Sequence, residues 1–446
     1  MDKRRIVILG AGESGIGAAL LARQKGYDVL VSDSSEIKAL YKNELELNKI
    51  DFEEGHTEER VLNADVIIKS PGIPEENELI KKIRAKRIEI ISEIEFGYRY
   101  KGDSRIIAVT GSNGKSTTTA LVYHICKTAG LSCALVGNIG YSFARQVAEE
   151  PKDIYAAEIS SFQLDDIKDF RPDIAILLNI SEDHLDRYDY KFENYIKSKF
   201  RIIENQTEKD VFIYCLDDEI TVKNLNKFLI RSNPLPITMS KPLPQGAYIS
   251  DAKMHLKWKQ EEVLMNVEDF AVKGKHNQYN TMAAGLAAVV MDIRKVRIRD
   301  AVQTFESLEH RMEPVATIKG VEFINDSKAT NVNSTWYALE SITKPTILIL
   351  GGIDKGNDYS FIKDLVKEKV KAIVCMGIDN RKIHEAFGNE VELIVNTNNV
   401  KDAVQSAFHF ANKGDVILLS PACASFDLFK NYEDRGKQFK QAVKEL

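Results

Sequence analysis

Short apolar runs rich in β-branched residues recur along the chain, and most of them end in a turn of glycine, serine or acidic residues. Continuous apolar runs of this length are typical of parallel strands that are buried on both faces. The predicted strands are 5–9, 28–32, 65–69, 106–109, 154–157, 174–178, 323–326, 346–350, 372–376, 392–395 and 416–419. Segments with helical spacing separate these runs, which predicts an α/β protein.

Helical periodicity is clearest at 18–25, 115–129, 192–204 and 281–291. A chain of 446 residues is too long for a single core. We therefore predict three domains, each a mainly parallel sheet flanked by helices. They are a Rossmann-like N-terminal domain at 1–96, a central P-loop ATPase domain at 97–307 and a Rossmann-like C-terminal domain at 308–446.

The strand at 106–109 runs into a glycine loop and then a helix, in the sequence GSNGKST at 111–117. Backbone N–H groups at a helix start converge on one point, where the helix dipole favours an anion. Lys115 adds a positive charge for phosphates, and the Ser116 hydroxyl can bind Mg²⁺. The loop is shorter than GxxxxGK[ST], but a turn that only caps a helix would leave the Lys-Ser pair unexplained.

A second glycine motif follows the first strand, where Gly10, Gly12 and Gly15 satisfy GxGxxG. Asp33 ends the second strand, near the acidic position that a dinucleotide fold uses for ribose. This pattern alone predicts an NAD-dependent dehydrogenase, although a UDP-sugar diphosphate fits equally well. The Ser-Pro-Gly turn at 70–72 ends another strand, where ligands bind in open α/β sheets, but an ordinary tight turn explains it as well.

Two further strand ends of the central segment present Glu158 and His184 on the same sheet edge as Ser116. These side chains could coordinate Mg²⁺, although magnesium prefers oxygen and His184 could equally be a packed loop residue. From sequence alone, Lys197, Lys199 and Arg201 form a solvated helix face.

In the C-terminal segment, three strand ends carry Asp326 with Lys328, Lys355 on a glycine turn, and Ser420 with Ser425. This set is a candidate pocket for a small anion. Cys423 is expected to be a buried small residue, because no histidine lies near it in sequence and GxSxG is absent.

Composition narrows the function further. The formal net charge is −5 with both signs interspersed, which argues against a nucleic-acid partner. The basic clusters at 81–87 and 294–299 are expected to be solvated helix faces. The five cysteines form no CxxC pair, in keeping with a reduced, cytoplasmic setting. No run approaches the roughly 18 apolar residues of a membrane span, so we expect no membrane insertion.

Several blocks, taken in order, resemble the Mur ligase family of cell-wall amide ligases over essentially the whole chain. They are GSNGKST at 111–117, NISEDHLDRY at 179–188, KHNQYN at 275–280, HR at 310–311 and INDSKATN at 324–331. Ser327-Lys328 follows Asp326 where other members and folylpolyglutamate synthases usually carry a histidine. With LLSPACASFD at 418–427 and GAGESG at 10–15, this is similar to the members that add D-glutamate.

The resemblance implies an ATP-dependent ligase that adds D-glutamate to UDP-N-acetylmuramoyl-L-alanine through an acyl phosphate, as a monomer. It implies ATP and Mg²⁺ as cofactors and a Lys199 carbamylated by CO₂. The implied catalytic residues are Lys115, Glu158, His184 and Lys199. The implied metal ligands are Ser116, Glu158, His184 and the Lys199 carbamate.

The resemblance also distributes the three substrates over the chain. ATP would contact Gly111, Asn113, Gly114, Lys115, Ser116, Thr117, Asn277, Arg311 and Asp326. The UDP-sugar would contact Ser14, Asp33, Ser34, Ser70, Gly72 and Asn138. D-glutamate would contact Thr330, Lys355, Ser425, Phe426 and Tyr432.

Three alternatives remain open at this point. A dehydrogenase would use GxGxxG with Asp33 but leave GSNGKST without a role. A nucleotide switch would use the phosphate loop but ignore both flanking sheets. Another Mur-type or folylpolyglutamate-type ligase would share the chemistry but select a different amino acid.

Overall fold

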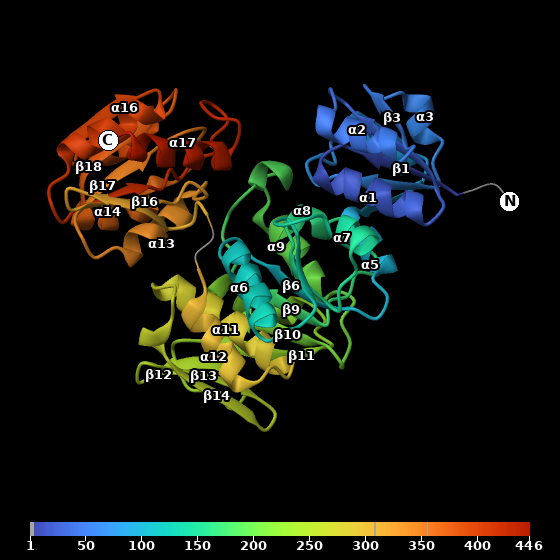
Figure 1. Ribbon diagram of the computed structural model, residues 1–446, viewed down its shortest axis with the longest axis horizontal. Helices are drawn as coiled ribbons and strands as arrows, with labels where there is room; N and C mark the ends of the chain where they lie inside the picture. The colour runs from blue at the N-terminus through green and yellow to red at the C-terminus, as the bar shows by residue number, and fades with distance from the viewer. Residues whose placement is uncertain (1–3, 307–308, 355) are drawn as a thin grey trace. The chain divides into compact units, whose positions relative to one another are not determined.

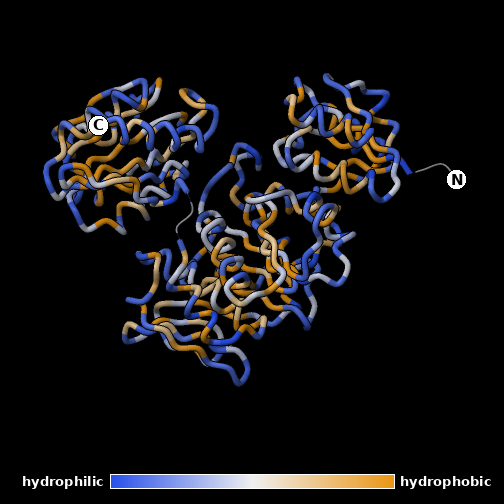
Figure 2. The backbone as a smooth tube through the Cα atoms, in the orientation of Figure 1, coloured by the Kyte–Doolittle hydropathy of each residue, from blue (hydrophilic) through white to orange (hydrophobic). Residues whose placement is uncertain are grey.

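The computed structural model describes residues 4–306, 309–354 and 356–446 (Figure 1). The chain forms three β-sheets, mostly parallel and flanked by helices, so the predicted α/β class is confirmed. Apolar residues concentrate in the strands of each sheet (Figure 2). Residues up to Ala271 form one compact unit with Asn277–Phe305, and Val272–His276 form a second unit with Glu306–Leu446.

The first sheet has the order β3-β2-β1-β4-β5 with every pair parallel. Its strands are β1 (Arg5–Leu9), β2 (Asp28–Asp33), β3 (Asp51–Glu54), β4 (Val66–Lys69) and β5 (Glu89–Ser92). The helices are α1 (Glu13–Gln24), α2 (Ala39–Leu47), α3 (Glu58–Leu62), α4 (Glu78–Ala85) and α5 (Glu93–Tyr100). Because β2 and β4 lie on opposite sides of β1, the glycine loop after β1 sits at the point where the strand order reverses.

Helix α1 begins at Glu13 rather than at the predicted Ala18. The first turns of this helix contain Gly15 and Gly17, which the prediction did not count as helical and which are needed for close packing. A Cβ at Gly15 would lie 1.9 Å from the carbonyl oxygen of Gly10, and one at Gly17 would lie 1.8 Å from Ser142 Oγ of the following sheet's layer. These two glycines lie inside the helix because only glycine allows such close approach to neighbouring segments. Glycine has a low helix propensity, so propensity alone does not predict a helix here.

The second sheet has the order β14-β13-β12-β11-β10-β9-β6-β8-β7. Its strands are β6 (Arg105–Thr110), β7 (Cys133–Gly137), β8 (Ile154–Glu158), β9 (Ile174–Leu177), β10 (Val211–Cys215), β11 (Asn233–Thr238), β12 (Gly246–Ser250), β13 (Lys253–Trp258) and β14 (Glu261–Asn266). The helices are α6 (Lys115–Thr128), α7 (Phe143–Glu149), α8 (Ser161–Leu164), α9 (Phe192–Phe200), α10 (Glu219–Asn224), α11 (Lys275–Val290) and α12 (Lys295–Thr304).

Strand β6 lies between β8 and β9 in this sheet, and both pairs are parallel. The loops that follow these three strands therefore share one edge. Strands β12, β13 and β14 pair in antiparallel fashion and were not predicted. Their alternating buried and exposed positions, clearest in β14, differ from the continuous apolar runs that marked the other strands.

The third sheet has the order β15-β16-β20-β17-β18-β19, and only the β15–β16 pair is antiparallel among the described pairs. Its strands are β15 (Glu313–Ile318), β16 (Val321–Asn325), β17 (Thr346–Leu350), β18 (Val370–Met376), β19 (Leu393–Thr397) and β20 (Val416–Leu419). The helices are α13 (Val332–Ser341), α14 (Lys363–Lys369), α15 (Arg381–Phe387), α16 (Val400–Phe410) and α17 (Tyr432–Lys444). Two apolar clusters cover its two faces.

Two predicted helices have different bounds. Helix α9 ends at Phe200 and is followed by the 3₁₀ turn η2 (Arg201–Ile203). Helix α11 begins at Lys275, before the predicted start at 281, because its polar first turn shows no apolar periodicity. The cysteines Cys126, Cys133, Cys215, Cys375 and Cys423 are free and buried. None of the described helices combines the length and apolar character that crossing a bilayer requires.

Candidate active site

The phosphate-loop sequence connects β6 to α6, as its pattern predicted. Gly114 has φ +84°, and a Cβ there would lie 2.4 Å from Asn280 Oδ1. Both the backbone conformation and the close approach therefore require glycine at this position. Ser116 is buried and Thr117 half-buried in the first turn of α6, which starts directly after the loop.

The first residues of the loop after β9 are hydrogen-bonded to the phosphate loop. Asn179 Oδ1 accepts a hydrogen bond from the Asn113 N–H at 2.9 Å, and its Nδ2 donates to the Asn113 carbonyl at 3.1 Å. Ser112 Oγ donates to the Ser181 carbonyl at 2.9 Å. The segment that leads to His184 is thereby held against the phosphate loop.

Two lysines converge on the phosphate loop from different helices. Lys115 Nζ donates to the carbonyls of Gly111 at 2.8 Å and Ser112 at 2.9 Å. Lys199 Nζ, from α9, donates to the same Gly111 carbonyl at 2.8 Å and lies 4.5 Å from the centre of the Tyr195 ring. Lys199 is 1% exposed, which contradicts the solvated helix face expected for it.

Burial lowers the pKa of Lys199 well below its usual value, and the nearby charge of Lys115 lowers it further. The carboxylates of Asp183, Asp165 and Glu158 act in the opposite direction on this pKa. The amine therefore sits among carboxylates but is desolvated, which favours its neutral form.

Glu158 ends β8 and is 1% exposed. Asn138 Nδ2 donates to Glu158 Oε1 at 2.9 Å, which links a predicted UDP-sugar residue to a predicted metal ligand. His184 has φ +54° and packs edge-to-face against Phe162, with ring centres 5.1 Å apart. A buried carboxylate and a serine hydroxyl beside a phosphate loop are the oxygen donors that suit Mg²⁺, so this edge fits the expected ion.

Asn277 lies in the first turn of α11 and is tied to the phosphate-loop helix through Asn280. Asn280 Nδ2 donates to Asn277 Oδ1 at 3.1 Å, and Thr118 Oγ1 donates to Asn280 Oδ1 at 3.2 Å. One side chain thus connects the predicted adenine contact with the phosphate loop.

The N-terminal strand edge gathers the predicted UDP-sugar residues. Gly10 has φ +95°, and a Cβ there would lie 2.5 Å from Ser70 Oγ, so the glycine loop and the turn after β4 are in close contact. Asp33 Oδ2 accepts from the Ala11 N–H at 2.7 Å, and its Oδ1 accepts from Ser35 N and Oγ, each at 2.9 Å. Burial opposes ionisation of Asp33, but these hydrogen bonds lower its pKa overall.

Ser14 and Ser70 are half-buried at this edge, while Ser34 and Gly72 are exposed. Asp33, at the end of β2, therefore stabilises the glycine loop through its hydrogen bond to Ala11. This gives the acidic residue a structural role independent of any ribose.

The C-terminal unit carries Asp326 at the end of β16, next to the ends of β20 and β17. Asp326 Oδ2 accepts from Ser420 Oγ at 2.9 Å, and Oδ1 accepts from the Met312 N–H at 3.2 Å, beside Arg311. Burial raises the pKa of Asp326 to about 7, against the effect of these hydrogen bonds and of Arg311.

Among the predicted D-glutamate residues, Thr330 follows β16, Ser425 and Phe426 follow β20, and Tyr432 begins α17. Ser425 is buried, Thr330 and Tyr432 are half-buried, and Phe426 is 67% exposed. Lys328 Nζ lies 5.1 Å from the centre of the Tyr432 ring. Lys355 lies outside the described residues. Cys423 is 2% exposed and its pKa is raised to about 11 by burial, in keeping with the expected packing role.

Sequence reasoning missed Arg435, which α17 places in the interior of this unit at 1% exposure. Its guanidinium donates to the Ser327 carbonyl at 2.8 Å and to the Cys423 carbonyl at 3.2 Å. It therefore fastens together the turns after β16 and β20. A lone arginine in a basic, amphipathic helix gave no signal of this role.

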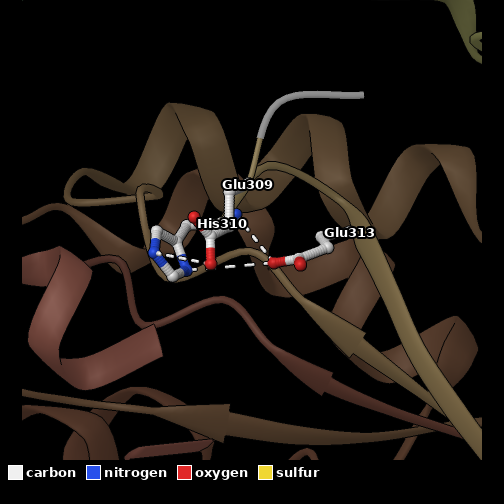
Figure 3. A group of neighbouring side chains, drawn as sticks. All are labelled: Glu309, His310 and Glu313. Carbon is white, nitrogen blue, oxygen red and sulfur yellow. Dashed lines mark hydrogen bonds and ion pairs between the residues drawn. The ribbon is translucent and has the colours of Figure 1, made fainter. Parts of the chain in front are cut away.

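A separate cluster of Glu309, His310 and Glu313 brings three ligand-type atoms within 4.8 Å of one another (Figure 3). It is the one such group in the described parts of the chain. Lys440 Nζ pairs with Glu309 and, at 2.9 Å, with Glu313, so an ammonium already offsets part of the charge of the two carboxylates. Asn325 Nδ2 donates to His310 Nδ1 at 2.9 Å. The cluster braces the segment before Arg311 and is a poor match for a metal.

Comparison with protein families gives three matches along the chain. Residues 5–79 match the MurD N-terminal domain, 109–288 the Mur ligase middle domain and 310–423 the Mur ligase, glutamate ligase domain. A protein of Bacteroides fragilis named "UDP-N-acetylmuramoylalanine--D-glutamate ligase" is 53% identical over 99% of this chain and 100% of its own length. A protein of the same name from Christiangramia forsetii is 52% identical over the same shares.

Solved structures show the same fold at low sequence identity. A pseudomurein peptide ligase type C from Methanothermus fervidus has a TM-score of 0.64 at 20% identity, covering 99% of both chains. The MurC ligase of Thermotoga maritima has a TM-score of 0.64 at 16% identity, again covering 99% of both chains. The three family matches and the full-length relatives agree, and the chain belongs to the Mur ligase family.

Proposed function

We propose that this protein is an ATP-dependent ligase that joins D-glutamate to UDP-N-acetylmuramoyl-L-alanine during peptidoglycan precursor synthesis, the activity of EC 6.3.2.9. The observation that carries the proposal is the single sheet edge on which Lys115, Ser116, Glu158 and Lys199 meet. The full-length similarity to ligases of that name supports the choice of substrates.

The chemistry requires activation, because an amine cannot displace oxide from a carboxylate. ATP transfers its γ-phosphoryl group to the substrate carboxylate, and the D-glutamate nitrogen attacks the resulting acyl phosphate with loss of phosphate and a proton. The protein contributes positioning and charge neutralisation. Lys115 and the backbone N–H groups at the start of α6 would bind the phosphates, with Gly111, Asn113, Gly114 and Thr117 shaping the loop.

Ser116 Oγ, Glu158 and His184 would hold Mg²⁺, which neutralises phosphate charge when it is bound. A cationic Lys199 would oppose that ion. A carbamate on Lys199 would instead supply an anionic oxygen ligand. Carbamylation forms an N–C bond between a neutral amine and CO₂ and releases a proton, and the burial that lowers the Lys199 pKa favours the neutral amine.

The remaining residues are assigned to the substrates by position. The UDP-sugar would bind at the first sheet's edge, near Ser14, Asp33, Ser34, Ser70, Gly72 and Asn138. Asn277, Arg311 and Asp326 would complete the ATP site. D-glutamate would contact Thr330, Ser425, Phe426, Tyr432 and the undescribed Lys355. We assign these functions to domains 1–96, 97–307 and 308–446 of a cytoplasmic monomer, a setting that the free cysteines support.

The test is phosphate release from ATP with UDP-N-acetylmuramoyl-L-alanine and a panel of amino acids. We expect turnover with D-glutamate and less than about a hundredth of that rate with L-glutamate, L-alanine or a diamino acid. A preference for one of those would move the chain to another Mur-type or folylpolyglutamate-type ligase. ATP turnover independent of any amino acid would indicate a nucleotide switch, and saturable quenching of NADH fluorescence would indicate a dehydrogenase.

A further inference from the structure

Arg187 reaches from the loop after β9 to the turn after β4, two segments that belong to different sheets. Its Nη1 donates to the Gly72 carbonyl at 3.2 Å, and its Nη2 donates to the Pro71 carbonyl at 3.2 Å. We propose that Arg187 is a positioning residue that sets the geometry of the 70–73 turn for binding the UDP-sugar. The inference rests on the proposed function, since it assigns that turn to the UDP-sugar site.

The guanidinium is fixed from two sides, so it is suited to act as a rigid clamp. Its central carbon lies 4.5 Å from the centre of the Phe162 ring, within cation–π range. In the described ranges 4–306, 309–354 and 356–446, no carboxylate forms an ion pair with Arg187. The charge is thus directed at two backbone carbonyls and one aromatic face rather than at an acidic side chain. A planar fork with two donors matches two adjacent carbonyls in a way that a lysine cannot.

Holding these carbonyls also orients the turn's donors. In a planar trans peptide the C=O and N–H groups point in opposite directions. Since the Pro71 carbonyl points at Arg187, the Gly72 N–H points away from it. The Ile73 N–H already donates to the Ser70 carbonyl at 3.1 Å, which closes the turn. Arg187 therefore selects one orientation of the Gly72 amide, and an amide with a fixed direction is a better donor to an anionic ligand.

The turn is anchored at its other end to the glycine loop. The Ser70 N–H donates to the Leu9 carbonyl at 3.0 Å, and Ser70 Oγ packs against Gly10. The turn is therefore held at one end by the glycine loop and at the other by Arg187.

Arg187 is also joined to the predicted metal loop. Its N–H donates to the His184 carbonyl at 3.0 Å within the short turn η1 (Leu185–Arg187). Phe162 contacts both side chains, facing Arg187 and packing edge-to-face with His184. The same loop therefore carries both the predicted metal ligand His184 and the arginine that holds the turn after β4.

The experiment compares Arg187→Ala and Arg187→Lys with the wild type by steady-state kinetics and by calorimetric binding of UDP-N-acetylmuramoyl-L-alanine. Two charge-assisted hydrogen bonds are lost in Arg187→Ala. We expect its affinity for the UDP-sugar to fall about 10- to 100-fold, with the KM values for ATP and D-glutamate within about twofold. Arg187→Lys should be intermediate, because an ammonium lacks the planar fork that meets both carbonyls together.

Lys191→Ala is the matched control, because it removes a positive charge from an exposed position of the same loop. It should leave the UDP-sugar affinity unchanged. Unchanged affinity for the UDP-sugar in both Arg187 variants would overturn the inference. A fall in kcat with unchanged affinity would also overturn it, because the effect of Arg187 would then be on the loop that carries His184 and not on UDP-sugar binding. If Arg187→Ala fails to fold, the UDP-sugar affinity of Arg187→Lys tests the inference. A wild-type protein that does not bind the UDP-sugar would refute the proposed function itself, whereas binding that ignores Arg187 refutes only this inference.

Discussion

Lys199 and Lys115 both donate from Nζ to the carbonyl oxygen of Gly111, each at 2.8 Å. Two ammonium groups that share one acceptor repel each other, and Lys199 is desolvated as well. The arrangement therefore penalises the cationic form of Lys199. Conversion of its amine to a carbamate would replace this repulsion with attraction to Lys115 and to a bound cation.

Replacing Lys199 by alanine should lower kcat at least about 1000-fold, because the proposed anionic ligand is lost from the site where charge is neutralised. The measurement is phosphate release at saturating substrates. Added formate or acetate should restore part of the rate by filling the vacated space. Removal of dissolved CO₂ should slow the wild type and leave the variant unaffected.

Lys197→Ala is the control for this prediction, since Lys197 is exposed on the same helix. It should keep the wild-type rate. An active wild-type protein whose intact mass shows an unmodified Lys199 amine under turnover conditions would contradict the carbamate.

The burial of Lys199 also shows where sequence reasoning stops. Lys197, Lys199 and Arg201 look alike as one basic stretch, yet only Lys199 among the three is fully buried. Its burial depends on the phosphate loop, which comes from a distant part of the sequence and covers that side of α9. Helical periodicity describes a helix's own faces and carries no information about which loop packs against them.

Most of the parallel strands that were predicted are continuous apolar runs buried on both faces. The parallel strands β3, β5, β7, β10 and β11 were not predicted. The antiparallel strands β12 to β14 were missed because their polar and apolar positions alternate. The phosphate loop was predictable because its chemistry is local in sequence. The contacts of Arg187, Arg435 and Asn179 join segments far apart in sequence, and a single sequence gives no signal for such pairs.

Gly114→Ala should raise the KM for ATP at least about tenfold. The φ of +84° costs an alanine about 1–2 kcal/mol, and its Cβ would displace Asn280, which holds Asn277. Gly102→Ala is a matched control, because its φ is +64° but nothing lies within 4 Å of the added Cβ. It should show a similar loss of stability in urea without a change in KM. Equal KM values for the two variants would mean that backbone strain alone matters.

Arg145 connects α7 to helices α1 and α2 of the first sheet's layer. It is 8% exposed, and its guanidinium pairs with Glu13 at 2.8 Å, Glu44 at 2.5 Å and Glu149 at 3.0 Å.

Arg145→Ala should lower the free energy of unfolding by about 2–3 kcal/mol, because three carboxylates lose their shared cation. Adding Glu13→Gln to Arg145→Ala should recover part of this loss in urea denaturation. Arg297→Ala, which breaks an exposed pair with Asp300 at 3.9 Å, should change it by less than about 0.5 kcal/mol. A loss in Arg145→Ala no larger than this control's would contradict the prediction.

Glu93 begins α5 and lies buried beside α7, where its Oε1 accepts from the Ala144 N–H at 2.5 Å. Burial raises its pKa from 4.5 to about 7, against the effect of that hydrogen bond. Below pH 4.5 the carboxyl is protonated in both the folded and the unfolded state. Between pH 4.5 and 7 the unfolded state loses its proton first, so the free energy of unfolding falls as the pH rises. Above pH 7 the full cost is present, about 3 kcal/mol for a shift of this size.

Glu93→Gln keeps an oxygen acceptor for Ala144 and removes the titration. The unfolding free energy of the wild type minus that of the variant should therefore decrease by about 3 kcal/mol between pH 4.5 and 8 in urea denaturation. Glu36→Gln, at an exposed position, is the control for the same substitution outside the core. If the difference in unfolding free energy between wild type and Glu93→Gln does not change with pH, the folded protein does not raise the pKa of Glu93. An increase with pH would mean that the fold lowers the pKa of Glu93.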